Sequence, residues 1–166
     1  MSAVALRPYI PADAKRCAEI FRSSIEELAA EDYDDEQREA WASRADDEEA
    51  FGARLAEALT LLAVIDGAIT GFASLKGAEE IDMLFVDPRF ARQGVGRTLV
   101  NALTRLAQAR GAKRLTTEAS DVAKPLFELE GFTAQKRNLV RMGEQWLANT
   151  TMSKTLGAEP APPTRH

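Results

Sequence analysis

Histidine and cysteine are almost absent from this chain of 166 residues. The one cysteine is Cys17, which excludes an intrachain disulfide and a cysteine-based zinc or iron–sulfur site. The one histidine is His166, the last residue, which excludes a Ser-His-Asp triad or a Cys-His pair in a folded core. Any chemistry must therefore use carboxylates, hydroxyls, backbone groups and a bound cofactor, and we expect no metal site.

Long apolar runs are absent as well. No stretch of about 18 apolar residues could span a membrane, and residues 1–10 lack the apolar segment of a secretory signal. We therefore expect a cytoplasmic protein with no membrane role. The length and the 45% hydrophobic content predict a single domain over residues 1–156. A disordered, proline-rich tail is expected over residues 157–166.

The net charge of −5 is unevenly distributed. Residues 26–50 contain twelve acidic residues and two bases, Arg38 and Arg44, so this segment carries −10 and the rest of the chain +5. A broad basic face is missing, which argues against nucleic-acid binding. The pattern favours an anionic cofactor at one place and a cationic acceptor steered to another. A solvated acidic pair of helices would explain it equally well.

Hydrophobic periodicity predicts a mixed α/β sheet of about seven strands with four to five helices. A stripe that includes Cys17 and Phe21 indicates the first helix and predicts that Cys17 is a buried apolar residue. Further helices are predicted over residues 35–45, 47–58, 94–110 and 121–130. Strands are predicted over residues 3–7, 61–65, 68–75, 81–86, 113–118, 132–141 and 146–154.

Residues 81–99, IDMLFVDPRFARQGVGRTL, are the most informative stretch. An apolar strand ends, a loop rich in arginine follows, and Gly94 and Gly96 open a long helix. Glycine lets backbone N–H groups approach a ligand closely, and a helix N-terminus attracts phosphate. A P-loop is excluded because its Gly-Lys-Ser/Thr sequence is missing. A Rossmann fingerprint is excluded because its third glycine would fall on Leu99.

The segment LFVDP…RQGVGRTL resembles the acyl-CoA-binding motif Q/R-x-x-G-x-G/A of the GNAT N-acetyltransferase superfamily. The opening LRPY, the segment AKPLFELEGF and the last two predicted strands also resemble that family, so the likeness covers about residues 3–156. It implies the GNAT-type acyl-CoA N-acyltransferase fold. It also implies an enzyme that transfers an acetyl group from acetyl-CoA to a primary amine on a small molecule or peptide, and a homodimer is common among members.

The resemblance assigns acetyl-CoA to a strand, a helix N-terminus and the segment before the Gly131-Phe132 dipeptide. The residues assigned are Leu84, Phe85 and Val86; Arg92, Gln93, Gly94, Val95, Gly96, Arg97 and Thr98; and Ser120, Lys124 and Phe127. The strand would hold the pantetheine arm, and one of its N–H groups would bind the thioester oxygen. The first motif position falls on Ala91, a departure that matters little where backbone N–H groups make the contacts.

Asp82 is the first candidate for the base that deprotonates the amine. Strand alternation places it on one face with Leu84 and Val86, and an unpaired carboxylate in such a strand is costly to bury. Acids on this strand often serve as the base in the family, although an ion pair would also explain Asp82. Glu80 and Glu118 are the alternatives.

The general acid is the weakest part of the resemblance. Many members have a tyrosine four residues before the glycine of the Gly-Phe dipeptide, where this chain has Phe127. Ser120 falls where an asparagine is often found. Tyr33, Ser120 or water would then protonate the CoA thiolate, although packing alone would account for Tyr33. Phe127 also leaves open a second function, an acyl-CoA-binding module without catalytic turnover.

Overall fold

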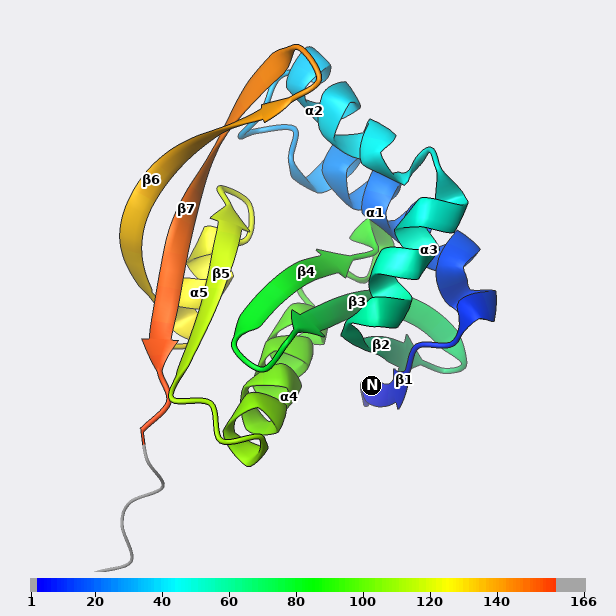
Figure 1. Ribbon diagram of the computed structural model, residues 1–166. Coiled ribbons are helices and arrows are strands. Elements are labelled where there is room, and N and C mark those ends of the chain that lie inside the picture. Colours follow the sequence, from blue (N-terminus) through cyan, green and yellow to red (C-terminus); the bar gives the residue numbers. More distant parts are fainter. Residues whose placement is uncertain (1–2, 158–166) are drawn as a thin grey trace, which may run out of the picture.

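The computed structural model describes residues 3–157, which form a seven-stranded sheet with helices on both faces (Figure 1). The strands are β1 (Ala5–Pro8), β2 (Leu59–Ile65), β3 (Ala68–Lys76), β4 (Glu80–Val86), β5 (Arg114–Ser120), β6 (Thr133–Met142) and β7 (Gln145–Thr155). The α-helices are α1 (Ala14–Ser23), α2 (Asp35–Ala42), α3 (Glu48–Glu57), α4 (Val95–Ala109) and α5 (Lys124–Leu129). The predicted fold class is confirmed. The predicted tail lies, apart from Gly157, outside the described residues.

The sheet has the strand order β1-β2-β3-β4-β5-β7-β6. Its neighbouring strands are antiparallel except for β4 and β5, which are parallel. That parallel pair is short, because only Glu80 with Thr116 and Ile81 with Thr117 are in register. Beyond this point the two strands diverge (Figure 1). The sheet is thereby opened at its centre, and the β5-facing backbone groups of β4 beyond Ile81 have no partner in the sheet.

Helices cover the two faces of the β1–β4 half differently. On one face, Leu99 and Leu103 of α4 pack with Ala73 of β3 in a fully buried core. On the other face, Phe21 of α1 packs with Phe72 of β3, and α3 joins this second core. Cys17 lies in the second core with no exposed surface, as predicted, and burial raises the pKa of its thiol to about 12. The two faces of this half-sheet are therefore distinct environments.

A β-bulge interrupts the pairing of β3 with β4. Ser74 is opposite Met83, but Leu75 is opposite Ile81, so Asp82 is an extra residue on β4. A bulge of this kind resets the alternation of side chains along a strand and re-aims the residue at the bulge.

The bulge overturns the predicted orientation of Asp82. Leu84 and Val86 pack against the core under α4. Asp82 instead reaches Arg54 of α3, on the opposite face of the sheet. The prediction from strict alternation was wrong because it assumes regular pairing along the whole strand. The extra residue at the bulge shifts the alternation of side chains between the two faces by one position.

Candidate active site

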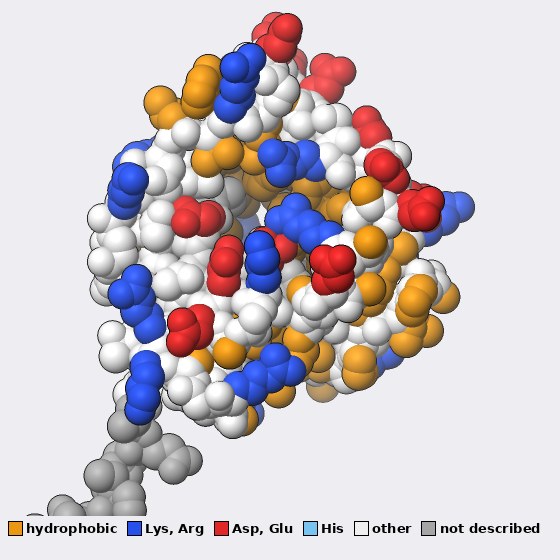
Figure 2. Space-filling model, in the orientation of Figure 1, with side chains coloured by type: hydrophobic (Ala, Val, Ile, Leu, Met, Phe, Trp, Pro, Cys, Tyr) orange, Lys and Arg blue, Asp and Glu red, His pale blue; other side chains and the backbone are white. Residues whose placement is uncertain are grey.

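A cavity of about 290 Å³ opens where β4 and β5 diverge. Figure 2 shows a hollow in this face of the molecule with acidic and basic side chains at its rim. The lining contains eight residues singled out from the sequence: Tyr33, Glu80, Asp82, Leu84, Phe85, Glu118, Ser120 and Phe127. The predicted catalytic candidates are thus brought together from segments far apart in the chain. Val86, residues 92–98 and Lys124 are not part of this lining.

Asp82 is held by two hydrogen bonds within one ion pair. Its Oδ2 accepts from Arg54 Nε and its Oδ1 from Arg54 Nη2, both at 2.9 Å. The Asp82 side chain is 11% exposed, whereas that of Arg54 is 47% exposed. Both oxygens thus accept a hydrogen bond from Arg54, and each keeps a further lone pair that can accept a proton.

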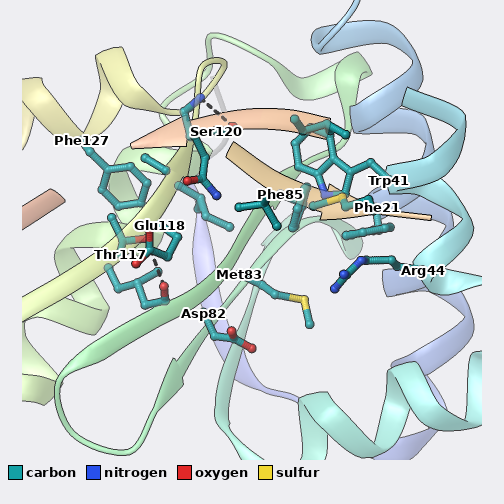
Figure 3. A pocket seen from close by; sticks show the side chains of 18 of the residues that line it. Phe21, Trp41, Arg44, Asp82, Met83, Phe85, Thr117, Glu118, Ser120 and Phe127 are labelled. Carbon is teal, nitrogen blue, oxygen red and sulfur yellow. Dashed lines mark hydrogen bonds between the residues drawn. The ribbon is translucent and has the colours of Figure 1, made fainter. Parts of the chain in front are cut away.

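The pairing between β4 and β5 ends at Ile81 and Thr117, so Asp82 and Glu118 are the first residues past it on the two strands. Its Oε2 accepts hydrogen bonds from the Thr151 hydroxyl at 2.7 Å and the Asn138 amide at 3.0 Å. Its Oε1 has no hydrogen-bond donor within the described part of the chain. Figure 3 shows Asp82 and Glu118 on the walls of the same cavity, one from each diverging strand. Glu118 therefore has one oxygen fixed and one available.

Tyr33 is almost fully buried at the wall of the cavity. Its hydroxyl donates to the Ala148 carbonyl at 2.6 Å and accepts from the Asp121 amide at 2.9 Å. Burial raises the pKa of this phenol. These bonds tie the segment between α1 and α2 to β7 and to the loop after β5. The contacts suit a positioning role, and proton donation by Tyr33 stays a prediction.

Phe127 and Ser120 form the α5 side of the cavity. Phe127 is 2% exposed and packs edge-on against Phe132, with ring centroids 5.1 Å apart. The Ser120 hydroxyl accepts from the Ala123 amide at 3.1 Å, which fixes the turn into α5. The apolar ring of Phe127 thus occupies the wall where the resemblance implied a phenol.

The N-terminus of α4 presents open backbone donors. Gly94 and Arg92 have φ angles of +81° and +63°, in the left-handed region. The first helical hydrogen bond runs from the Thr98 amide to the Gly94 carbonyl at 3.0 Å, and no side chain in the described part of the chain caps the helix. The amides of residues 95–97 therefore have no partner inside the helix, and they coincide with the positive end of its dipole. Such a terminus suits a phosphate group.

The two glycines at this terminus serve different purposes. Nothing lies within 4 Å of a Cβ added at Gly94, so glycine is favoured there by the positive φ angle. A Cβ at Gly96 would approach Leu126 of α5 to 2.8 Å. Gly96 is therefore needed for the close packing of α4 on α5, and its role towards a ligand stays a prediction.

The basic side chains near this terminus are only partly available. Arg97 pairs with Glu130 at 3.1 Å, and Arg89 pairs with Asp87 at 2.9 Å. Arg92 and Lys124 have no hydrogen bond or ion pair among the described residues. Backbone amides, together with Arg92 and Lys124, are thus the principal open donors for an anion here.

Asp87 anchors the loop between β4 and α4. It is 3% exposed and accepts hydrogen bonds from Arg89 and from Arg16 of α1, the latter at 2.5 Å. Burial raises the pKa of this carboxyl, but the hydrogen bonds from the two arginines outweigh burial and bring the pKa well below its usual range. Asp87 therefore joins α1, β4 and the loop that leads to α4.

Several lining residues were not identified as site residues from the sequence. Arg44 and Arg54 enter the cavity from the segment after α2 and from α3, and Phe21 of α1 contributes to one wall. Isolated arginines on acidic helices give no sequence signal of a site. Within residues 3–157, no group of three or more His, Cys, Asp and Glu side chains could hold a metal ion. None of the helices described is long and apolar enough to cross a membrane.

The amino-acid sequence matches a known family model and is similar to a known acetyltransferase. Residues 29–156 match the family model described as an acetyltransferase (GNAT) domain. The chain is 34% identical over 152 residues to the uncharacterized N-acetyltransferase YafP of Escherichia coli K12, covering 92% of this chain and 96% of YafP.

Two solved structures are similar over nearly their whole length. The first is a GCN5-related N-acetyltransferase from Rhodopseudomonas palustris, which also carries the name Aminotransferase, Class-II. It has a TM-score of 0.92 and 55% identity, covering 94% of this chain and 98% of that one. The second is the PaiA N-acetyltransferase of Thermoplasma acidophilum in complex with coenzyme A. Its TM-score is 0.77 at 19% identity, covering 92% and 99%, which shows a shared fold.

Proposed function

The chain belongs to the GNAT acetyltransferase family, and we propose that it transfers the acetyl group of acetyl-CoA directly to a primary amine. The observation that supports this most is the opening between β4 and β5, where Asp82 and Glu118 face one cavity. The strand that borders this opening leads, through one short loop, to the uncapped N-terminus of α4.

The cofactor would lie along this strand and helix. The amides of residues 95–97 and the side chain of Arg92 would bind the pyrophosphate. The backbone of residues 84–86 would hold the pantetheine arm, since the β5-facing groups of β4 have no sheet partner there. One of these N–H groups would hold the thioester oxygen as negative charge develops on it. The structure from Thermoplasma acidophilum, which shares this fold, was solved with coenzyme A, which supports coenzyme A as the type of ligand.

The acceptor must lose a proton before it can react, because an alkylammonium of the lysine type is free base only about once in 2,500 at pH 7. Asp82 would accept this proton on a lone pair that Arg54 does not occupy, and Glu118 would accept it on Oε1, since the hydrogen bonds to Glu118 engage only its Oε2. Glu80, also in the lining, is the third candidate. The amine nitrogen then attacks the thioester carbon, the C–N bond forms, and the C–S bond breaks with its electron pair on sulfur.

The departing thiolate must be able to leave without a phenol. A thiol such as that of cysteine has a pKa of about 8.5, so its thiolate is a tolerable leaving group. Water or the Ser120 hydroxyl can return a proton to it. Tyr33 would have to break its bond to the Ala148 carbonyl to do so.

A second candidate function is an acyl-CoA-binding module without turnover. It is favoured by the apolar ring of Phe127 and by the two hydrogen bonds that engage the Tyr33 hydroxyl. Binding of acetyl-CoA is common to both functions, so release of the thiol distinguishes them.

The test is the release of CoA thiol from acetyl-CoA in the presence of a panel of amines, beside a thermal melt with CoA. Cys17 is buried and will not contribute to the signal of a thiol reagent. We expect CoA to raise the melting temperature and at least one amine to accelerate thiol release. Stabilisation by CoA without release for any amine would support the binding module. If CoA does not raise the melting temperature and no amine releases thiol, both functions are rejected.

A further inference from the structure

Arg44 is directed into the cavity and has no hydrogen-bond or ion-pair partner among residues 3–157. It lies in the short helix η3 (Ser43–Ala45), between α2 and α3. Figure 3 shows its guanidinium pointing into the cavity from the side opposite Glu118 and Phe127. The backbone beneath it is fixed, because Ala45 is fully buried and its carbonyl accepts a hydrogen bond from Arg22 at 2.8 Å. The fold therefore fixes the backbone of Arg44 beside the cavity, and its exposed side chain reaches the cavity from there.

The neighbouring arginines are all engaged. Arg38 pairs with Asp35, Arg22 contacts Asp46, and Arg54 pairs with Asp82. Arg44 has no hydrogen bond or ion pair among the described residues, although the segment 26–50 contains twelve acidic residues. A guanidinium offers five N–H donors in a planar fork that matches a carboxylate or phosphate. The guanidinium N–H donors of Arg44 are thus available to a ligand in the cavity.

The surroundings of Arg44 favour an anion there. Phe21, Trp41 and Phe85 form an edge-to-face aromatic cluster at the cavity wall, with Trp41 and Phe85 centroids 5.9 Å apart. Arg44 is itself exposed, so the favourable term there is the charge-assisted hydrogen bond, which is stronger than a neutral one.

The anion would not be the pyrophosphate of the cofactor. The N-terminus of α4 belongs to the face of the sheet that α4 covers, whereas the short helix with Arg44 packs with α1 and α3 on the other face. An acidic group at Arg44 would therefore be part of the acceptor.

We propose that the acceptor is an amine that also bears an acidic group, with a carboxylate or phosphate held by Arg44. This inference rests on the proposed acetyl transfer and specifies its substrate class. The amine end would lie towards Asp82 and Glu118, and the acidic end would lie on the guanidinium of Arg44, past the aromatic wall. At neutral pH such a substrate is zwitterionic or anionic, unlike the cationic acceptor that the acidic segment suggested.

The experiment measures kcat/KM for matched pairs of amines. One pair is 4-(aminomethyl)benzoate and benzylamine, which differ by a carboxylate at the far end of the ring from the amine. The other pair is glucosamine 6-phosphate and glucosamine, which differ by a phosphate. We expect the acidic member of at least one pair to be preferred at least tenfold, and the pair that shows the preference identifies the group. A protein that acetylates only amines without an acidic group would refute the proposal.

Variants at Arg44 connect the preference to this side chain. In Arg44→Ala, we expect the ratio of the two kcat/KM values to fall about 10- to 150-fold, as expected for a lost hydrogen bond to a charged group. Arg44→Lys should retain part of the ratio, because it keeps the charge without the fork. The loss should appear in the KM of the acceptor and not in that of acetyl-CoA. Arg105→Ala, at an exposed position of α4, is the matched control and should keep the wild-type ratio.

The remaining outcomes separate the two proposals. An unchanged ratio in Arg44→Ala, or an equal loss for both members of a pair, would overturn the role of Arg44 and leave acetyl transfer standing. Stabilisation by CoA with no acetylation of any amine would instead reject the proposed activity, and the acceptor class with it.

Discussion

Replacing Gly94 separates the role of the α4 N-terminus in folding from its role in binding CoA. Gly94 has a φ angle of +81°, and a Cβ added there meets no atom within 4 Å. Any other residue therefore costs about 1–2 kcal/mol of backbone strain but causes no clash. Since about 1 kcal/mol changes the melting temperature of a domain of this size by about 2–4 °C, Gly94→Ala should melt about 2–8 °C lower and remain folded.

Gly94→Glu adds a negative charge to the same strain. An acid near a helix N-terminus stabilises the helix by about 0.3–1 kcal/mol, so Gly94→Glu should be at least as stable as Gly94→Ala. On CoA affinity, the added negative charge has the opposite effect. Two unit charges about 6 Å apart at an effective dielectric constant of about 20 repel by about 3 kcal/mol, which weakens binding by about 100-fold. Stability and affinity should thus move in opposite directions between the two variants.

The assay is titration calorimetry with CoA beside thermal melts for Gly94→Ala, Gly94→Glu and Gly94→Lys. Gly94→Lys carries the same strain with a positive charge and should bind CoA no more weakly than Gly94→Ala. The penalty in Gly94→Glu should shrink at high ionic strength. Equal affinity of the folded Glu and Ala variants would show that the pyrophosphate does not lie at this terminus. Gly96 is unsuitable for this test, because its substitution would also displace Leu126.

Three further predictions concern catalysis and stability. Asp82→Asn should lower kcat/KM by about 10²–10⁴ at pH 7, with a smaller loss at high pH and unchanged CoA affinity. If this variant keeps the wild-type pH–rate profile, the base is Glu118 instead, and Glu118→Gln should show the loss. Phe127→Tyr should remain folded in a thermal melt and give an equal or higher kcat, because Phe127 lines the cavity. If the variant unfolds, the added hydroxyl is buried in the core and does not face the cavity. The lowered pKa of Asp87 means that its carboxylate stabilises the fold above the unfolded pKa of about 3.9 and that this contribution is lost as the pH falls. In urea unfolding, the stability difference between the wild type and Asp87→Asn should therefore shrink between pH 7 and pH 3, and a constant difference would contradict the ion-pair explanation.

The sequence by itself determined the elements and their order. Local periodicity predicted every strand of the sheet and the five α-helices to within a few residues, because side-chain spacing reflects which face of an element is buried. It also predicted the burial of Cys17 and the glycine-opened start of α4, since both follow from residues close together in the chain. The family resemblance rested on the same local motifs.

Tertiary structure alone decided how the candidate residues are arranged. The bulge at Asp82 arises from pairing with β3, and its partner Arg54 is 28 residues away in the chain. The hydroxyl of Tyr33 bonds to a carbonyl 115 residues away. Arg44 looks like any base in an acidic segment until the fold aims it into the cavity. Contacts between distant segments depend on how the whole sheet and its helices pack, and no local pattern of residues encodes them.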